Sequence, residues 1–333
     1  MDLAFDARAR LGSYSSFTRT LELLETSAER AGLTFEEWQS GPCTAPVLWS
    51  PQLEPPPVQN LRLVLTLHDV NPLQDDGRPW FQRLRREFFF RRKVQRALAR
   101  SWRLVTDSQD SAERIRQAFP QIGDRIHVVP LFADPMFQPG EVDPAFLAAS
   151  DLKPGYVLFL GAMRRHKNWD RLLRAYARLP LDLRQAHPLI FAGSRRRARR
   201  SFPQLVAELA LQNHVRHLGS VAGKDLPKLY RGAALFVFPS SLEGFGLPPL
   251  EAMACGTPVV SSPCTSLPEV LGEAPAYADP EDLEAFAETM QQILQSPPLQ
   301  QKLKSAGLLQ AQRYHPGRTG ESMKQLLQTE MAS

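Results

Sequence analysis

Two glutamates, Glu243 and Glu251, stand eight positions apart in a segment whose residue types are those of a ligand site. The segment, SSLEGFGLPPLEAMACGT, follows the apolar run 234–238, which predicts a buried strand. In open α/β sheets, ligands bind beyond the carboxyl ends of such strands. Two interpretations are open from these residues alone. Either both carboxylates face one crevice, or Glu243 only interacts with a helix dipole and Glu251 is a solvated helix residue.

The residues between the two glutamates favour a helix that begins at a phosphate-binding turn. Gly244 and Gly246 let the backbone turn tightly and come close to a ligand. Pro248 and Pro249 suit the first helical turn, where no N–H is needed. We therefore expect a helix over residues 248–255. Its bare N–H groups and the positive end of its dipole would point at the loop, an arrangement that binds phosphate.

Lys167 follows another predicted strand, the apolar run 156–160, and stands six residues after Gly161. A cation at this place would stabilise the negative charge on a departing phosphate. The alternative is a lysine that is merely solvated. The neighbouring Arg164 and Arg165 are further candidates for phosphate contact.

His68 and Asp69 end the apolar run 61–67, LRLVLTL. The histidine either points into a ligand cleft or is structural, and Asp69 either orients it or caps the next helix. Asp107 and Ser108 end the following run, and we take them as structural.

Residues 243–260, EGFGLPPLEAMACGTPVV, resemble the E-x7-E segment of the family 4 retaining glycosyltransferases. YVLFLGAMRRHKNWD at 156–170 and LTLHDVNP at 65–72 resemble two further elements of that family. The resemblance implies a GT-B fold, with Glu243 beside the transferred sugar, Glu251 on the nucleotide ribose, Lys167 on the leaving diphosphate and His68 facing the sugar. The catalytic residues that it implies are Glu243, Lys167 and His68. The donor-binding residues that it implies are Gly12, Arg164, Arg165, Lys167, Val221, Glu243, Gly244, Phe245, Gly246, Leu247 and Glu251.

The sequence departs from the family pattern at two places. Many relatives carry Arg directly after the glycine that stands here as Gly161, whereas this chain has Ala162. The second positive charge then comes from Arg164 or Arg165, or is missing. Relatives also carry a Gly-Gly-x-Gly loop after the first strand, where this chain has only Gly12. Either Gly12 and Ser13 approach the phosphates, or the N-terminal half contacts the donor less.

The sequence contains no motif typical of a metal site or of a redox cofactor site. It has no D-x-D and no C-x-x-C, and its three cysteines cannot form a disulfide framework, which favours a reducing compartment. We expect no cofactor and no metal ion, and the nucleotide sugar would be a co-substrate.

The formal net charge of +5 is concentrated in two segments. Residues 78–103 hold ten Lys or Arg against one Glu, interleaved with aromatic residues, and residues 195–200 hold five Arg. The remainder is acidic, which argues against a nucleic-acid partner and for local anchoring. Three interpretations of the first segment are open: a helix on an anionic membrane, a helix whose aromatics pack into the core, or a site for an anionic acceptor. The residues we assign to membrane or acceptor contact are Arg85, Arg86, Arg91, Arg92 and Lys93.

The elements that must position these residues are alternating strands and helices, which predict a doubly wound α/β fold. We expect two Rossmann-like domains facing a cleft, over residues 1–150 and 151–312, and a helix in 313–333 that crosses back to the first. The first domain would bind the acceptor and the second the nucleotide sugar. Residues 1–10 lack the apolar core of a signal peptide, and no segment is apolar enough to span a membrane. We expect a cytoplasmic protein, with contact at the inner face of the membrane left open.

The predicted function is transfer of a hexose, with retention, from a nucleoside diphosphate sugar of the GDP-mannose or UDP-hexose type. The acceptor would be a glycan or lipid-linked glycan. The alternatives are a nucleotide-sugar epimerase or hydrolase of the same fold, or a protein that only binds nucleotide sugars or anionic polymers.

Overall fold

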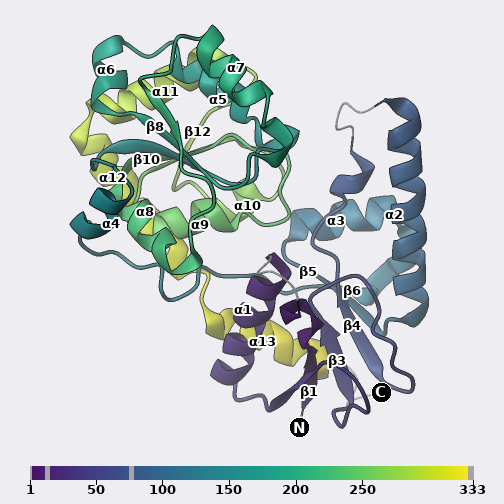
Figure 1. Ribbon diagram of the computed structural model, residues 1–333. Coiled ribbons are helices and arrows are strands. Elements are labelled where there is room, and N and C mark those ends of the chain that lie inside the picture. The colour runs from purple at the N-terminus through teal and green to yellow at the C-terminus, as the bar shows by residue number, and fades with distance from the viewer. Residues whose placement is uncertain (1, 12–15, 75–78, 329–333) are drawn as a thin grey trace. The chain divides into compact units, whose positions relative to one another are not determined.

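The computed structural model describes residues 2–11, 16–74 and 79–328. The chain forms two compact units, each built on its own parallel sheet (Figure 1). Unit 1 comprises Met1–Phe132 and Tyr314–Ser333, and unit 2 comprises Ala133–Arg313. Two Rossmann-like units confirm the predicted doubly wound α/β class.

Six parallel strands form the sheet of unit 1, in the order β2-β1-β3-β4-β5-β6. They are β1 (Leu3–Asp6), β2 (Phe35–Trp38), β3 (Val47–Ser50), β4 (Arg62–Thr66), β5 (Arg103–Thr106) and β6 (Ile126–Val128). The near-continuous apolar runs of β1, β3, β4 and β5 are buried, as expected for strands covered on both faces. The sequence pattern missed β2, an edge strand in which Glu36 and Glu37 interrupt the apolar residues and only Trp38 is buried.

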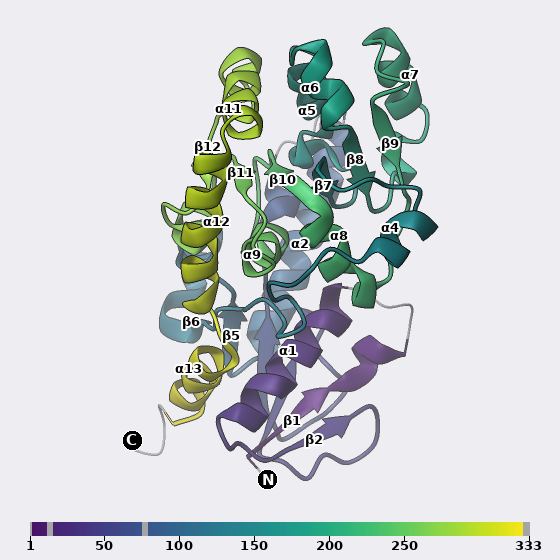
Figure 2. The ribbon, with the colours of Figure 1, turned by 90° about the vertical axis from the view of Figure 1, so that its left-hand side faces the viewer.

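The helices of unit 1 surround this sheet, and the last of them comes from the far end of the chain. They are η1 (Ala7–Arg10), α1 (Ser16–Arg30), η2 (Asn71–Leu73), α2 (Trp80–Arg100), α3 (Gln109–Ala118), η3 (Pro120–Arg125) and α13 (Pro316–Gln328). In Figures 1 and 2, α13 lies beside α1. A Cβ on Gly320 would lie 2.5 Å from the carbonyl oxygen of Ser27, so only glycine permits this approach. The hydroxyl of Thr319 donates to the carbonyl of Pro130 at 2.6 Å, and Met323 joins the core beneath β1. The expected return of the C-terminal helix is confirmed.

Unit 2 is built on a second six-stranded parallel sheet, in the order β12-β11-β10-β7-β8-β9. Its strands are β7 (Tyr156–Leu160), β8 (Leu189–Ala192), β9 (Val215–His217), β10 (Ala233–Phe238), β11 (Val259–Ser261) and β12 (Ala276–Tyr277). Its helices are α4 (Pro144–Ala149), η4 (Arg165–Lys167), α5 (Trp169–Tyr176), α6 (Leu181–Ala186), η5 (Arg196–Ala198), α7 (Ser201–Glu208), η6 (Gly223–Asp225), α8 (Leu226–Gly232), α9 (Leu247–Ala254), α10 (Leu267–Leu271), α11 (Leu283–Gln295) and α12 (Pro297–Gln312). Phe159, Phe191 and Phe202 pack at centroid distances of 5.1 Å in the core between the sheet and α7.

The segment 133–150 belongs to unit 2, whereas the sequence predicts a domain boundary after residue 150. Asp143 begins α4 by accepting a hydrogen bond from the N–H of Phe146 at 2.9 Å. The same carboxylate forms an ion pair with Lys228 of α8 at 3.1 Å, and Arg231 donates to the carbonyl of Gln138. These contacts hold the proline-rich segment against α8, so the division between the units falls after Phe132.

Among the helices in the described ranges, none has the length and apolar character that crossing a membrane requires.

Candidate active site

The N-terminus of α9 lies at the carboxyl end of β10, and Gly246 makes the turn between them possible. Gly246 has φ of 103° and is the N-cap, and Pro248 and Pro249 occupy the first turn, as their sequence predicted. A Cβ at Gly246 would lie 2.7 Å from Leu267 Cδ2, so both the backbone conformation and the close packing select glycine. Pro248 and Pro249 carry no N–H and that of Leu250 donates to the carbonyl of Gly246, so the helix dipole is what makes this end electropositive.

Lys167 and Glu243 form an ion pair beside this helix end. Lys167 Nζ lies 2.5 Å from Glu243 Oε1, and both side chains are largely buried, at 14% and 13% exposure. The ammonium also lies 4.7 Å from the ring centroid of Phe238, the last residue of β10. The pair joins two segments that are 76 residues apart in sequence, so a lysine that is merely solvated is the wrong interpretation.

Backbone hydrogen bonds fix the two loops that carry this pair. The carbonyl of His166 accepts from the N–H of Ser241 at 2.8 Å and from the hydroxyl of Ser240 at 3.1 Å. Asn168, buried and left-handed at φ of 47°, donates its side-chain amide to the carbonyl of Pro239 at 2.8 Å. The loop after β7 and the loop after β10 therefore form one rigid edge, which holds the Lys167–Glu243 pair in place.

Glu251 is fully buried inside α9 and accepts a hydrogen bond from the Tyr230 hydroxyl at 3.0 Å. The interpretation of Glu251 as a solvated helix residue is therefore wrong. Its partner comes from α8, and the hydroxyl of Thr257 in turn donates to the carbonyl of Tyr230 at 2.8 Å. A buried carboxylate held in this way has a fixed orientation.

The remaining predicted donor-binding residues of unit 2 lie in the loop after β7, the turn into α9 and the loop after β9. Arg164 and Arg165 are exposed at the start of η4, and neither forms an ion pair with any residue that the structure describes. Phe245 is buried, and Gly244 and Leu247 are half-buried in the turn into α9. Val221 is half-buried in the loop between β9 and η6.

His68 lies in unit 1, at the carboxyl end of β4, and is held by Asp107. Its Nδ1 lies 2.6 Å from Asp107 Oδ2, and its Nε2 lies 3.2 Å from the carbonyl of Pro51. Burial lowers the pKa of the imidazole, but the carboxylate of Asp107 outweighs that effect and raises the pKa to about 9. At neutral pH His68 is therefore an imidazolium whose two N–H groups both donate to protein oxygens.

The sequence predicted structural roles for both Asp107 and Ser108. It did not predict the contact that Asp107 makes with His68. Ser108 caps α3 by accepting from the N–H of Ser111 at 3.1 Å, but Asp107 is the ion-pair partner of His68. The carboxylate of Asp69 accepts from the N–H of Asn71 and closes the turn into η2, and its charge adds to that of Asp107 in raising the pKa of His68. The pairing of β4 with β5 in the sheet is the signal that brings the ends of these strands together. Gly12 lies outside the described residues.

Comparison with known proteins identifies the family. Residues 146–310 match the model of the glycosyl transferases group 1 family. The O-antigen chain mannosyltransferase B of Escherichia coli is 36% identical over 256 residues, which cover 76% of this chain and 66% of that protein. The chain belongs to the group 1 glycosyltransferases. The resemblance to the family 4 retaining enzymes is thereby confirmed.

Two further comparisons place the chain within this family and its fold. The serotype-specific mannosyltransferase WbdA of Escherichia coli is 29% identical over 280 residues, covering 80% of this chain and 34% of that protein. The chain thus spans just under two thirds of one curated relative and about a third of the other. A sucrose-phosphate synthase structure from Thermosynechococcus elongatus superposes with a TM-score of 0.76 at 20% identity, covering 100% of this chain and 99% of that one. This likeness shows the GT-B fold.

The family match contains Lys167, Glu243 and Glu251, whereas His68 lies outside it. The match therefore covers the ion pair and the α9 turn, but it says nothing of the His68–Asp107 pair.

The five basic residues assigned to membrane or acceptor contact lie on α2 in unit 1. Arg85, Arg92 and Lys93 are exposed, and Arg86 and Arg91 are half-buried. Arg86 donates to three backbone carbonyls around η2, and Arg91 pairs with Glu87 and donates to the carbonyl of Ala118. Arg86 and Arg91 thus attach α2 to unit 1, and Lys93 pairs with Glu54 at 3.5 Å, while Arg85 and Arg92 lie beside exposed aromatic rings.

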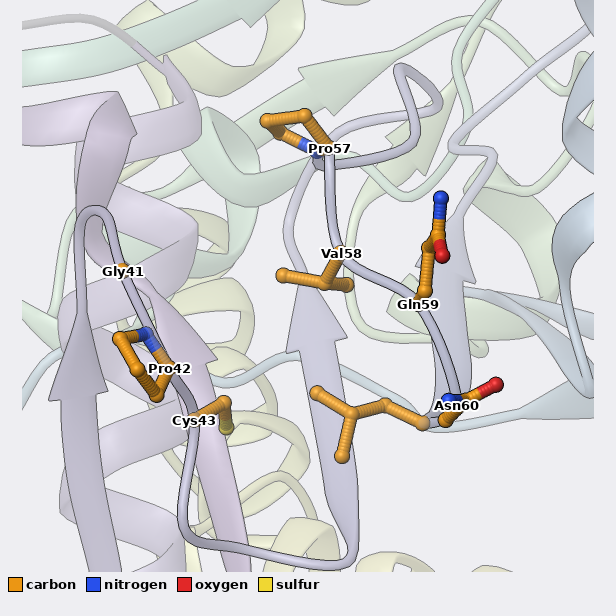
Figure 3. Close-up of a pocket in the computed structure, with 8 residues that line it drawn as sticks. Gly41, Pro42, Cys43, Pro57, Val58, Gln59 and Asn60 are labelled. Atoms are coloured by element: carbon orange, nitrogen blue, oxygen red, sulfur yellow. The ribbon is translucent and has the colours of Figure 1, made fainter.

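A pocket of about 400 Å³ lies at the opposite edge of the unit 1 sheet, in the loops that precede β3 and β4 (Figure 3). Its lining is Gly41, Pro42, Cys43, Pro57, Val58, Gln59, Asn60 and Leu61, and Cys43 is the one titratable side chain in that set. This lining offers neither a general acid nor a charge for phosphate. Among the described residues, no group of three or more His, Cys, Asp or Glu side chains is placed to hold a metal ion.

Proposed function

We propose that this protein transfers a hexose from a nucleoside diphosphate sugar to a glycan acceptor, with retention at the anomeric carbon. The observation that carries the proposal is the Lys167–Glu243 ion pair at 2.5 Å, at the edge of the sheet where α9 begins. A cation, a carboxylate and an electropositive helix end are the groups that a sugar diphosphate requires. Unit 2 would bind the donor and unit 1 the acceptor.

Lys167 is proposed to hold the diphosphate. A bound diphosphate would compete with Glu243 for the ammonium, which the rigid loops already hold in position. The N–H of Leu247 and the positive end of the α9 dipole would share the remaining phosphate charge. Arg164 and Arg165 are exposed on the same loop as Lys167 and supply the second positive charge that Ala162 lacks. We propose that the residues themselves carry this charge, so that no metal ion is needed.

Glu243 and Glu251 are proposed to position the two ends of the donor. Glu243 would accept hydrogen bonds from the sugar hydroxyls once Lys167 turns to the diphosphate, and Glu251, held by Tyr230, would accept from the ribose. Val221 would line the nucleotide. Each group is held by the fold before the donor arrives, which lowers the cost of ordering it.

The proposed step forms one bond and breaks one. The acceptor hydroxyl oxygen bonds to the anomeric carbon, while the bond from that carbon to the diphosphate oxygen breaks. The departing diphosphate oxygen takes the hydroxyl proton. Both events occur on the same face of the sugar, so the configuration is retained. Lys167 and the α9 end stabilise the negative charge that develops on the diphosphate.

His68 is proposed as the residue of unit 1 that contacts the transferred sugar. Because Asp107 keeps it protonated, with a pKa of about 9, and both of its N–H groups donate to protein oxygens, it acts through its positive charge rather than as a base. Gly12, which the sequence also implies at the donor, lies outside the described residues.

The transferred sugar is proposed to be mannose, because the two curated relatives compared above are named as mannosyltransferases. The acceptor is proposed to be a growing polysaccharide chain of the O-antigen type, after the name of the first relative. We further propose a cytoplasmic protein that works beside a membrane carrying the lipid-linked acceptor.

A thermal-shift panel of GDP, UDP, GDP-mannose and UDP-glucose identifies the donor, since a ligand that binds the native state raises the melting temperature.

Transfer to a glycan acceptor is then measured with Lys167→Ala and Glu243→Ala. Lys228→Ala is the matched control, because its ion-pair partners, Asp143 and Asp225, are not among the residues proposed to bind the donor. Wild-type transfer rates in both test variants would overturn the proposal. Donor turnover that needs no acceptor would indicate the epimerase or hydrolase, and binding without turnover the non-enzymatic binding protein.

A further inference from the structure

One face of α2 carries large apolar side chains that unit 1 leaves in water. Between 52% and 71% of each is exposed, and the set is Trp80, Phe81, Leu84, Phe88 and Phe89. At about 100° per residue these positions fall within about half of the helix circumference, so they form one continuous stripe. Single exposed apolar residues are ordinary, but a contiguous group marks an interaction surface.

The opposite face of α2 fixes the direction in which this stripe points. Val94, Ala97 and Leu98 are buried in the core, and Phe90 packs against Phe119 with ring centroids 6.2 Å apart. Figure 1 shows α2 along one flank of unit 1. Because the helix is held by its buried face, it cannot rotate to bury the aromatic stripe. The interpretation in which all the aromatics pack into the core is therefore wrong for these five residues.

Arginines are interleaved with the aromatic rings along the same stripe. α2 holds eight Lys or Arg against one acidic residue, Glu87. The guanidinium of Arg85 lies 5.7 Å from the ring centroid of Phe89, and that of Arg92 lies 5.7 Å from that of Phe88. Glu87 pairs with Arg91, and within the described ranges neither Arg85 nor Arg92 has an acidic partner. The stripe therefore presents apolar rings together with unneutralised positive charge.

We infer that this face of α2 docks on the surface of an anionic membrane. Rings at the depth of the lipid headgroups, with guanidinium groups beside the phosphates, are the arrangement of helices that lie in the plane of a membrane. The excess of eight Lys or Arg over one Glu on α2 complements the negative charge of anionic lipid headgroups. The inference goes beyond the proposed reaction and does not depend on it, since docking requires neither donor nor acceptor.

Vesicle sedimentation of the full chain tests this inference. We expect the protein to sediment with vesicles of phosphatidylglycerol and phosphatidylcholine but not with phosphatidylcholine alone, and less at high salt. Phe88→Ser with Phe89→Ser, and separately Arg85→Glu with Arg92→Glu, should each weaken binding by about tenfold or more. All four side chains are exposed or stacked on exposed rings, so the fold should be retained, which circular dichroism checks.

Matched controls change the same residue types elsewhere. Leu181→Ser with Leu309→Ser removes two other apolar side chains that are 53% and 67% exposed. Lys153→Glu with Lys302→Glu makes the same change of net charge on exposed residues of unit 2. Vesicle binding by both control variants should equal that of the unaltered protein.

Trp80 reports the docking directly, because it is 71% exposed whereas Trp38, Trp49 and Trp169 are buried. Its fluorescence should shift to shorter wavelength with anionic vesicles, and Trp80→Phe should keep binding but lose most of the shift. Equal sedimentation of the α2 variants and the unaltered protein would overturn the inference. The inference would also be overturned if the α2 substitutions changed the oligomeric state and the unaltered protein did not bind vesicles. The stripe would then contact a second copy of the chain.

Discussion

Replacing Asp107 by Asn tests how strongly the buried carboxylate stabilises the charged form of His68. The substitution keeps the size of the side chain but removes the negative charge 2.6 Å from Nδ1. Without that charge, burial lowers the pKa of His68 while Asp69 and the Pro51 carbonyl still raise it, so the pKa should fall from about 9 toward its ordinary value of 6.5.

The magnitude follows from the rise of the pKa. A rise from 6.5 to about 9 corresponds to about 3 kcal/mol of stability, at about 1.4 kcal/mol per tenfold. Because the folded-state pKa is raised, this stability is fully present below pH 6.5 and is lost as pH rises through about 9. Asp107→Asn should therefore lower the free energy of unfolding of unit 1 by up to about 3 kcal/mol at pH 6, and by much less above pH 9.

Two measurements check this reasoning. NMR titration of the His68 imidazole gives the pKa, and urea unfolding at pH 6 and above pH 9 gives the stability difference. Asp110→Asn is the matched control, because Asp110 pairs with Arg114 at the surface of α3 and such pairs contribute about 1 kcal/mol or less. An imidazole that titrates near 6.5 in the unaltered protein would refute the reasoning. A stability loss of the same size at both pH values would do so as well.

Three further outcomes follow from the site and from unit 1. Lys167→Ala and Glu243→Ala should each reduce kcat/KM about 100- to 1000-fold, because each loses its own contact to the donor. Losses below about tenfold in transfer assays would contradict this. Gly246→Ala should destabilise unit 2 by about 1–3 kcal/mol in thermal unfolding and weaken nucleotide binding in calorimetry. An unchanged stability and affinity would show that alanine fits this turn without strain. Gly320→Ala should destabilise unit 1 by about 1–3 kcal/mol in thermal unfolding. The exposed Gly317→Ala in the same helix should be neutral or stabilising, and equal effects would argue against the close approach to α1.

Most of the fold could be predicted because buried parallel strands leave continuous apolar runs. The exceptions, β2 and β12, both lie at the edges of their sheets, and in β2 the Glu36 carboxylate accepts hydrogen bonds from the N–H groups of Thr44 and Ala45. Because Glu36 and Glu37 interrupt its apolar residues, the sequence pattern does not indicate a strand at β2. The boundary after Phe132 was equally hidden, because the contacts of 133–150 with α8 are made by residues more than eighty positions away.

At the candidate site, the sequence predicted those residues that lie in short motifs of neighbouring positions. The α9 turn follows from glycines and prolines within six positions of one another. The partners of the site residues do not: Asp107 lies 39 residues from His68, and Tyr230 lies 21 residues from Glu251. Which aromatics of α2 are exposed also could not be predicted, because the stripe that packs inward depends on the surface of unit 1. Sequence patterns indicate the chemical groups, and the tertiary fold decides their partners.

The attachment of α13 to α1 determines the order in which the two units can be completed during synthesis. Unit 2 is one continuous segment, so it can fold as soon as residue 313 has left the ribosome. Unit 1 must wait for residues 316–328, because Met323 and Leu326 of that helix close the core around Leu3 and Phe5. During this interval the first half of the chain keeps an apolar face open, although unit 2 has already folded. The nascent protein therefore depends most on chaperones before its last helix is made, and cleavage near residue 313 would undo unit 1 while leaving unit 2 intact.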